Sequence, residues 1–182
     1  MTFLSQGNPD IRQQVEASRG PLKKLQLLIP GLRGYRKLED IRVSDELLRN
    51  QVADRLDRVK GSLEQLRKQV VSSNDLTNLT TVGSLISQTQ ALSGEVRHAQ
   101  QGYSGWVAPI AISEDKLNKL YEYDYDFVSA VFQLADAAGK LTYDATAPNS
   151  VQASAAQISK TLNDIRQKWS TRIEAIEGIA IG

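Results

Sequence analysis

Residues 151–176 read VQASAAQISKTLNDIRQKWSTRIEAI, and this stretch decides the fold class. Within it, mostly apolar residues recur with alternating steps of four and three residues. The recurring residues are Val151, Ala155, Ile158, Leu162, Ile165, Trp169, Arg172 and Ile176. Such spacing places one side chain per turn on a single helical face, as in helices that pack side by side along a heptad repeat. The stretch therefore predicts a long helix with a core-facing stripe.

The same periodicity continues outward along the chain. It runs from Val52 to Val70 and again from Leu117 to Ala138, while no segment alternates in the manner of a strand. The predicted helices span 10–28, 36–73, 75–101, 114–139 and 149–178. At 1.5 Å per residue the second of these would be roughly 55 Å long. We therefore predict an all-α protein, an elongated antiparallel bundle of four to five helices with coiled-coil-like packing, in a single domain over 1–182.

The composition excludes several kinds of chemistry. The chain has no Cys, which excludes disulfides, thiolate metal sites and cysteine nucleophiles. Its one His, His98, excludes zinc sites built on two or three imidazoles. Glu95 and His98 form an E-x-x-H, but di-iron bundles use two copies of this motif. We expect no metal, no cofactor and no enzymatic activity.

Charge is balanced overall and uneven along the chain. The 22 Lys and Arg oppose 21 Asp and Glu, which argues against attraction of the whole chain to nucleic acid. Residues 1–74 nevertheless carry 14 basic and 9 acidic side chains, whereas residues 113–147 carry 3 basic and 7 acidic ones. A basic half and an acidic helix suit docking within a subunit or head-to-tail between subunits. We predict a non-enzymatic interaction or scaffold protein whose partner is a protein, with itself as the first candidate.

Two carboxylates occupy core positions of their helices. Asp45 and Asp124 each fall on the apolar stripe, where an unpaired charge would cost several kcal/mol. Arg42 and Arg49 lie three residues before and four residues after Asp45, within reach along a helix, and Tyr121 lies close to Asp124. These five residues predict a polar core cluster. It either binds an ion or small anion or, as we prefer, forms a buried network that sets helix register.

A basic turn precedes the second predicted helix. Residues 29–35 read IPGLRGY, and the turn is surrounded by Lys23, Lys24, Arg33, Arg36 and Lys37. Its two glycines would allow close approach of a phosphate, and the following helix would present its N-terminal amides. The alternative is a plain turn in which glycine supplies a positive φ and the basic side chains are solvated. The first reading makes the chain an anionic-ligand or peripheral membrane binder, which is our second functional hypothesis.

Tyr103 and Trp106 lie in an aromatic, Gly-containing loop between two predicted helices. They either close one end of the bundle or anchor an interface, because Tyr and Trp dominate binding hot spots. The first residues lack the basic and apolar regions of a secretory signal, and no stretch reaches the 18 apolar residues of a membrane span. We expect a cytoplasmic protein, membrane-peripheral if the basic turn touches lipid.

The IPGLRGY turn, together with Asp45, Leu48 and Arg49 in the helix after it, resembles a group of uncharacterised prokaryotic helical proteins. These share an I-P-G-x-x-G-Y turn that leads into a helix with a D-x-x-L-R step. The segment 120–124, LYEYD, is similar to a second shared segment of that group. The resemblance covers about a third of the chain. It implies helical architecture and nothing catalytic. It also favours one joint polar cluster of Asp45, Arg49 and Asp124 over two separate sites.

Overall fold

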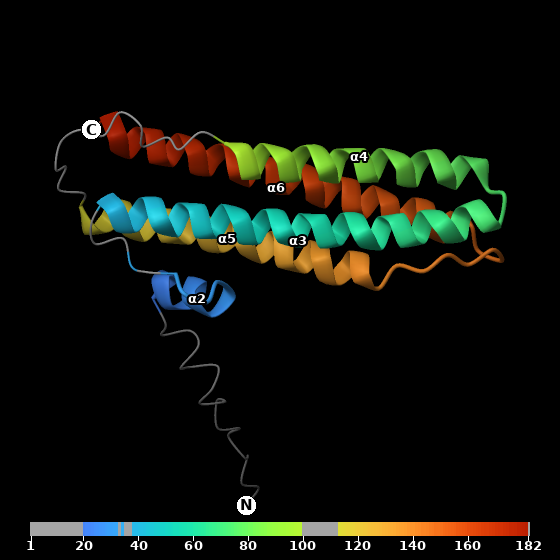
Figure 1. The fold of residues 1–182 in the computed structure, drawn as a ribbon, viewed down its shortest axis with the longest axis horizontal. Helices are drawn as coiled ribbons and strands as arrows, with labels where there is room; N and C mark the ends of the chain where they lie inside the picture. The colour runs from blue at the N-terminus through green and yellow to red at the C-terminus, as the bar shows by residue number, and fades with distance from the viewer. Residues whose placement is uncertain (1–19, 33, 35–37, 100–112, 182) are drawn as a thin grey trace, which may run out of the picture.

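The chain folds as an elongated all-α bundle in a computed structural model, which describes residues 20–32, 34, 38–99 and 113–181 (Figure 1). The helices are α2 (Pro21–Leu28), α3 (Leu38–Ser72), α4 (Leu76–His98), α5 (Glu114–Gly139) and α6 (Asn149–Ile181). The described residues contain no strand. The predicted fold class is confirmed. None of the described helices combines the length and the apolarity needed to cross a bilayer.

The four long helices stand at the corners of a square. α3 packs against α4 and α5, and α6 packs against the same two helices, so α4 and α5 lie at opposite corners. Consecutive long helices run antiparallel, as predicted (Figure 1). The α4 and α6 pair runs parallel, since Gln88 contacts Ser159 and Glu95 contacts Arg166, an advance of seven residues on both helices. α3 and α5 also run parallel (Figure 1). The bundle therefore has two pairs of parallel neighbours, α4 with α6 and α3 with α5, that the heptad pattern did not reveal.

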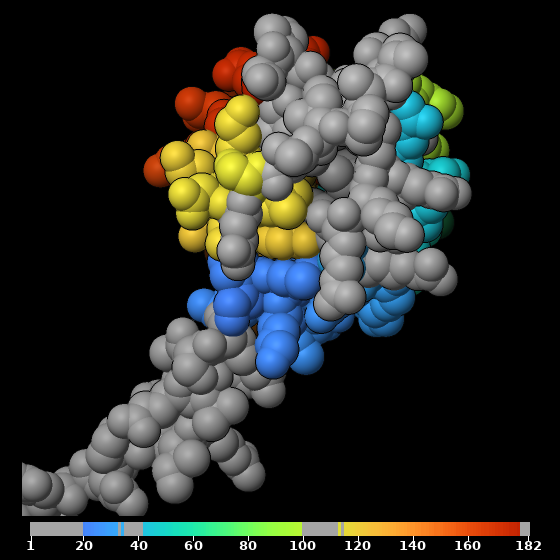
Figure 2. Space-filling view, turned by 90° about the vertical axis from the view of Figure 1, so that its left-hand side faces the viewer, coloured from blue at the N-terminus to red at the C-terminus, as the bar shows by residue number. Residues whose placement is uncertain are grey.

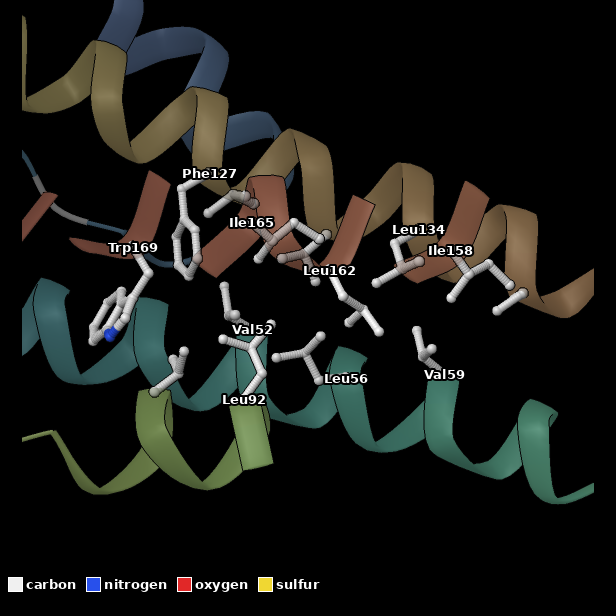
Figure 3. Close-up of a cluster of buried hydrophobic side chains, with 14 of the residues drawn as sticks. Val52, Leu56, Val59, Leu92, Phe127, Leu134, Ile158, Leu162, Ile165 and Trp169 are labelled. Atoms are coloured by element: carbon white, nitrogen blue, oxygen red, sulfur yellow. The ribbon is translucent and has the colours of Figure 1, made fainter. Parts of the chain in front are cut away.

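The heptad stripes form the core. All eight stripe residues of 151–176 are at most 5% exposed, including Arg172. The stripes of α3 and α5 are buried in the same way from Leu48 to Val70 and from Leu120 to Ala138. Side chains from all four long helices meet in the interior, where Leu56, Leu92 and Leu162 lie close together (Figure 3). Burial of this apolar surface is the main free-energy term that holds the bundle together.

Helix ends follow the local sequence with one exception. The Asp75 side chain accepts a hydrogen bond from Asn78 N at the start of α4, and the Ser113 side chain accepts one from Lys116 N at the start of α5. Both are standard N-caps. The expected stop at Gly178 is wrong, because α6 continues to Ile181. Glycine is conformationally permissive and can take helical dihedrals, so Gly178 by itself does not end the helix.

The short helix α2 lies outside the square, against α5 (Figures 1 and 2). Leu25 and Ile29 bury their side chains fully, so α2 extends the core instead of hanging free. Of the predicted helix over 10–28, residues 10–19 lie outside the described part. Gly31 in the following turn has a φ of +87°, a conformation that favours glycine.

Candidate functional site

Four buried charges meet in the core, and we call them the ion cluster: Asp45, Arg49, Asp124 and Arg172. Arg49 Nε donates to Asp45 Oδ2 at 2.8 Å, and Arg172 Nη2 lies 2.7 Å from Asp45 Oδ1. Arg172 Nε donates to Asp124 Oδ1. No member is more than 7% exposed, and Asp124 is fully buried. Arg172 on α6 therefore joins the carboxylates of α3 and α5.

Arg49 extends the ion cluster to the fourth long helix. Its Nη1 donates to the carbonyl oxygens of Arg97 and Ala99 at 3.1 and 3.3 Å. These carbonyls belong to the last turn of α4 and its C-cap, where backbone acceptors have no partner within the helix. A cation there also complements the negative end of the helix dipole. One network thus connects α3, α4, α5 and α6 at one end of the bundle.

The chemistry open to the ion cluster follows from its charge balance. Two carboxylates and two guanidinium groups give a net charge of zero, and both Asp45 oxygens are engaged by arginines. Buried ion pairs of this kind seldom add stability over apolar residues, but breaking one leaves a costly uncompensated charge. The ring of Trp169 lies 5.3 Å from the Arg172 guanidinium and equally far from the Phe127 ring. The arrangement suits a fixed network that sets helix register.

The predicted polar core residues divide between the ion cluster and its surroundings. The structure brings Asp45, Arg49 and Asp124 together, as the joint-cluster hypothesis requires. Arg42 is half-buried one turn before Asp45. Tyr121 is buried, and its hydroxyl lies 3.8 Å from where a β-carbon on Gly34 would stand, beside the turn that follows α2.

Arg172 is the member of the ion cluster that the sequence analysis does not identify. Heptad spacing puts it on the stripe of 151–176 but does not show that it is the partner of the two aspartates. The sequence does contain an indication of this pairing. Arg172 is a basic residue on one core stripe, and Asp45 and Asp124 are acidic residues on two others. Opposite charges on core positions of different helices indicate a buried pair, since neither can remain alone in an apolar core.

The other predicted site residues do not form a cluster within the described part of the chain. Lys23 is exposed and Lys24 is half-buried on α2, whereas Arg33, Arg36 and Lys37 lie outside the described side chains. Tyr103 and Trp106 also lie outside the described part. Glu95, half of the E-x-x-H motif, forms an ion pair with Arg166 at 3.3 Å. Within the described ranges no three His, Cys, Asp or Glu residues gather in a way that could hold a metal ion.

A second polar cluster closes the other end of the bundle, around Asp75. Asn78 donates to both Asp75 carboxylate oxygens, through its backbone N at 3.1 Å and its side-chain Nδ2 at 2.6 Å. Tyr143 Oη donates to Asp75 Oδ2 at 3.0 Å. The hydrogen bonds from Asn78, aided by the one from Tyr143, hold the pKa of Asp75 below its usual value. Burial and the bond to Asp75 raise the pKa of Tyr143.

This geometry predicts an acid-sensitive contribution from Asp75. Its pKa is lower in the folded than in the unfolded chain, so its stabilisation is complete above about pH 4 and is lost as the pH falls through the folded value. Asp75→Asn keeps a capping side chain and removes the titration. We expect its free energy of unfolding, measured by urea titration, to fall less steeply below about pH 4 than that of the unsubstituted chain.

The control for this prediction is Asp136→Asn, which removes one carboxylate from an exposed ion pair with Lys140. It should leave the acid slope nearly unchanged. Equal slopes for Asp75→Asn and the unsubstituted chain would contradict the prediction.

Comparison of the chain with protein-family models, with curated proteins and with solved structures finds no match. The resemblance of its IPGLRGY turn stays a prediction.

Proposed function

We propose that this chain is a non-enzymatic helical interaction protein that associates with a second copy of itself. The observation that carries the proposal is a broad surface without charge, formed by most of α4, the end of the loop before α6 and the first third of α6, which we call the uncharged face. Residues 76–94 and 145–159 contain no Asp, Glu, Lys, Arg or His, although 24% of the chain is charged. Solvent-facing helix surfaces usually carry charge on the side opposite the core.

The two halves of the uncharged face lie side by side. Gln88 on α4 and Ser159 on α6 share a hydrogen bond of 3.3 Å, and a groove of about 390 Å³ runs between the helices. The groove is lined by Thr80, Thr81, Ser84, Leu85, Gln88, Gln152, Ala155, Ala156 and Ser159. Every one of these side chains is neutral and most are small. Another helix could therefore approach closely without leaving a charge unpaired.

Three residues of the uncharged face that do not line the groove also support a contact with another chain. Leu76, at the start of α4, is 70% exposed, a large fraction for a leucine. Gly83 and Gly94 lie inside α4, where glycine is unfavourable by about 0.5–1 kcal/mol relative to alanine. A β-carbon at either position would meet no atom within 4 Å, so packing within the subunit does not require glycine there. The approach of a second backbone would give both glycines a role.

A second copy suits the uncharged face better than a charged partner does. In a two-fold dimer the same patch meets itself, so a patch that carries charge of one sign would face charge of the same sign. A neutral patch avoids this repulsion. The ion cluster leaves its charged groups engaged with one another, which supports a structural role for them and a function that resides on the surface.

Sedimentation velocity over a concentration series tests the proposal. We expect a reversible dimer whose dissociation constant changes little between low and physiological salt, because the contact contains no ion pairs. Ser87→Lys places a positive charge on the exposed side of α4 and should raise the dissociation constant at least about tenfold. Gln65→Lys, the same addition on an exposed position of α3, should have little effect.

Two outcomes would contradict self-association through the uncharged face. A strict monomer at all concentrations would remove self-association altogether. A dimer that salt dissociates and that Ser87→Lys leaves intact would instead indicate the charge-driven, head-to-tail docking that the uneven charge distribution suggests.

A further inference from the structure

A second surface groove lies between α2, α3 and α5, and we call it the basic groove. It has a volume of about 500 Å³ and is lined by Leu27, Leu28, Pro30, Gln51, Asp54, Arg55, Arg58 and Phe132. Leu27 is 61% exposed at its edge. The groove therefore combines an apolar wall from α2 with two guanidinium groups from α3.

The arginine next to Phe132 is held in a defined position. The Arg55 guanidinium carbon lies 4.0 Å from the centroid of the Phe132 ring. Stacking occupies the flat face of a guanidinium and leaves its N–H donors, which lie in the plane, free to bind an anion. Because Arg55 is already ordered by the ring, little side-chain entropy remains to be lost when a ligand binds.

Arg58 lies three residues later, on the same side of α3. Over the described ranges, no carboxylate lies within ion-pair distance of Arg55 or Arg58. Asp54, the acid in the groove lining, is 3.0 Å from Arg97 instead. The basic groove therefore presents two cations, about one helical turn apart, that the described part of the subunit does not neutralise.

We propose that the basic groove binds an acidic amphipathic helix of a partner protein. An apolar side chain of that helix packs on Leu27, Leu28 and Pro30, and two carboxylates one turn apart bind Arg55 and Arg58. Arginine and carboxylate form paired, charge-assisted hydrogen bonds, which gives the contact direction as well as strength. Lys23, exposed on α2, adds to the positive field.

Charge and shape together select this occupant. A helix carries residues i and i+4 on one face, a spacing that matches the separation of Arg55 and Arg58. A concave groove between helices receives a protruding helix face, which is the usual geometry of helix-in-groove recognition. The proposal goes beyond self-association, because it concerns another surface and another partner.

The test uses the full chain and a labelled synthetic helix of Ala, Leu and Glu, with Glu pairs one turn apart. Fluorescence anisotropy should show binding that weakens with added salt. The matched peptide with Gln in place of Glu should bind at least about tenfold more weakly. Arg58→Glu should weaken binding of the Glu peptide by at least about tenfold, whereas Lys68→Glu, the same reversal at an exposed position farther along α3, should not.

Several outcomes would overturn the proposal. Equal binding of the Glu and Gln peptides, no binding of either, or equal effects of Arg58→Glu and Lys68→Glu would each contradict it. Flotation with vesicles of phosphatidylcholine, with and without phosphatidylserine, tests whether the basic groove binds acidic lipid instead. If acidic vesicles bind the chain through Arg58 and the Glu peptide does not bind, the basic groove is a lipid-docking surface and the proposal is wrong. Sedimentation of Arg58→Glu checks that dimerisation is unchanged, so failure of one proposal is distinguishable from failure of the other.

Discussion

Arg172→Met is expected to destabilise the fold by about 3–5 kcal/mol, the cost of leaving buried charge without its partner. Arg172 is 1% exposed and contacts both Asp45 and Asp124. Methionine fills much of the same volume but donates no hydrogen bond. Asp124, fully buried, would then lose the cation that compensates it. Guanidinium chloride titration followed by circular dichroism measures the effect.

A double substitution separates lost compensation from lost packing. Asp124→Leu/Arg172→Met removes one charge of each sign and leaves the neutral Asp45–Arg49 pair, whose Nε–Oδ2 distance is 2.8 Å. We expect the double variant to recover most of the stability that Arg172→Met loses, because apolar residues of similar volume replace buried ion pairs with little cost. If the double variant were as unstable as the single one, the loss would come from packing and the electrostatic explanation would be wrong.

Leu56→Ala is expected to cost about 2–5 kcal/mol, the range for a leucine truncated inside a packed core. Leu56 is fully buried on α3, near the middle of the bundle, among apolar side chains of the other long helices (Figure 3). Truncation removes buried apolar surface and leaves a cavity that rigid helices close only in part. The same denaturant titration gives the free-energy difference.

Leu27→Ala is the matched control, since it removes the same atoms from a leucine that is 61% exposed. We expect a change within about 0.5 kcal/mol, as for most surface substitutions. Comparable losses at Leu56 and Leu27 would mean that the core does not lie where the heptad stripes place it.

Much of the fold follows from periodicity. The stripe of 151–176 is buried at every predicted position, and the predicted ends of the four long helices agree with the observed ones to within a few residues. Helix α4 was the least specified, because its core includes Asn78, Thr89 and Ser93. Polar residues inside a stripe weaken the hydrophobic pattern on which periodicity depends. Their burial is evident only from neighbouring helices, as when Ser93 Oγ donates to Asp57 Oδ1 at 2.8 Å.

Part of the ion cluster could be predicted from the sequence. Asp45 and Asp124 stood out because a carboxylate on a core stripe needs a partner, and Arg49 lies within reach on the same helix. The partner on another helix, Arg172, could not be assigned by spacing, since heptad phase says which face points inward and not which helices face each other. The basic groove was likewise hidden, because it combines residues of α2, α3 and α5.

The sequence by itself determined that this chain is helical, which face of α3, α5 and α6 is buried, and that two carboxylates enter the core. These are local properties, set by side-chain period along one helix. Only the tertiary structure decided that α4 lies beside α6 and opposite α5, and that Arg172 joins Asp45 to Asp124. Neighbour choice depends on the packing of side chains distant in sequence. The ion cluster, the uncharged face and the basic groove all arise from that choice.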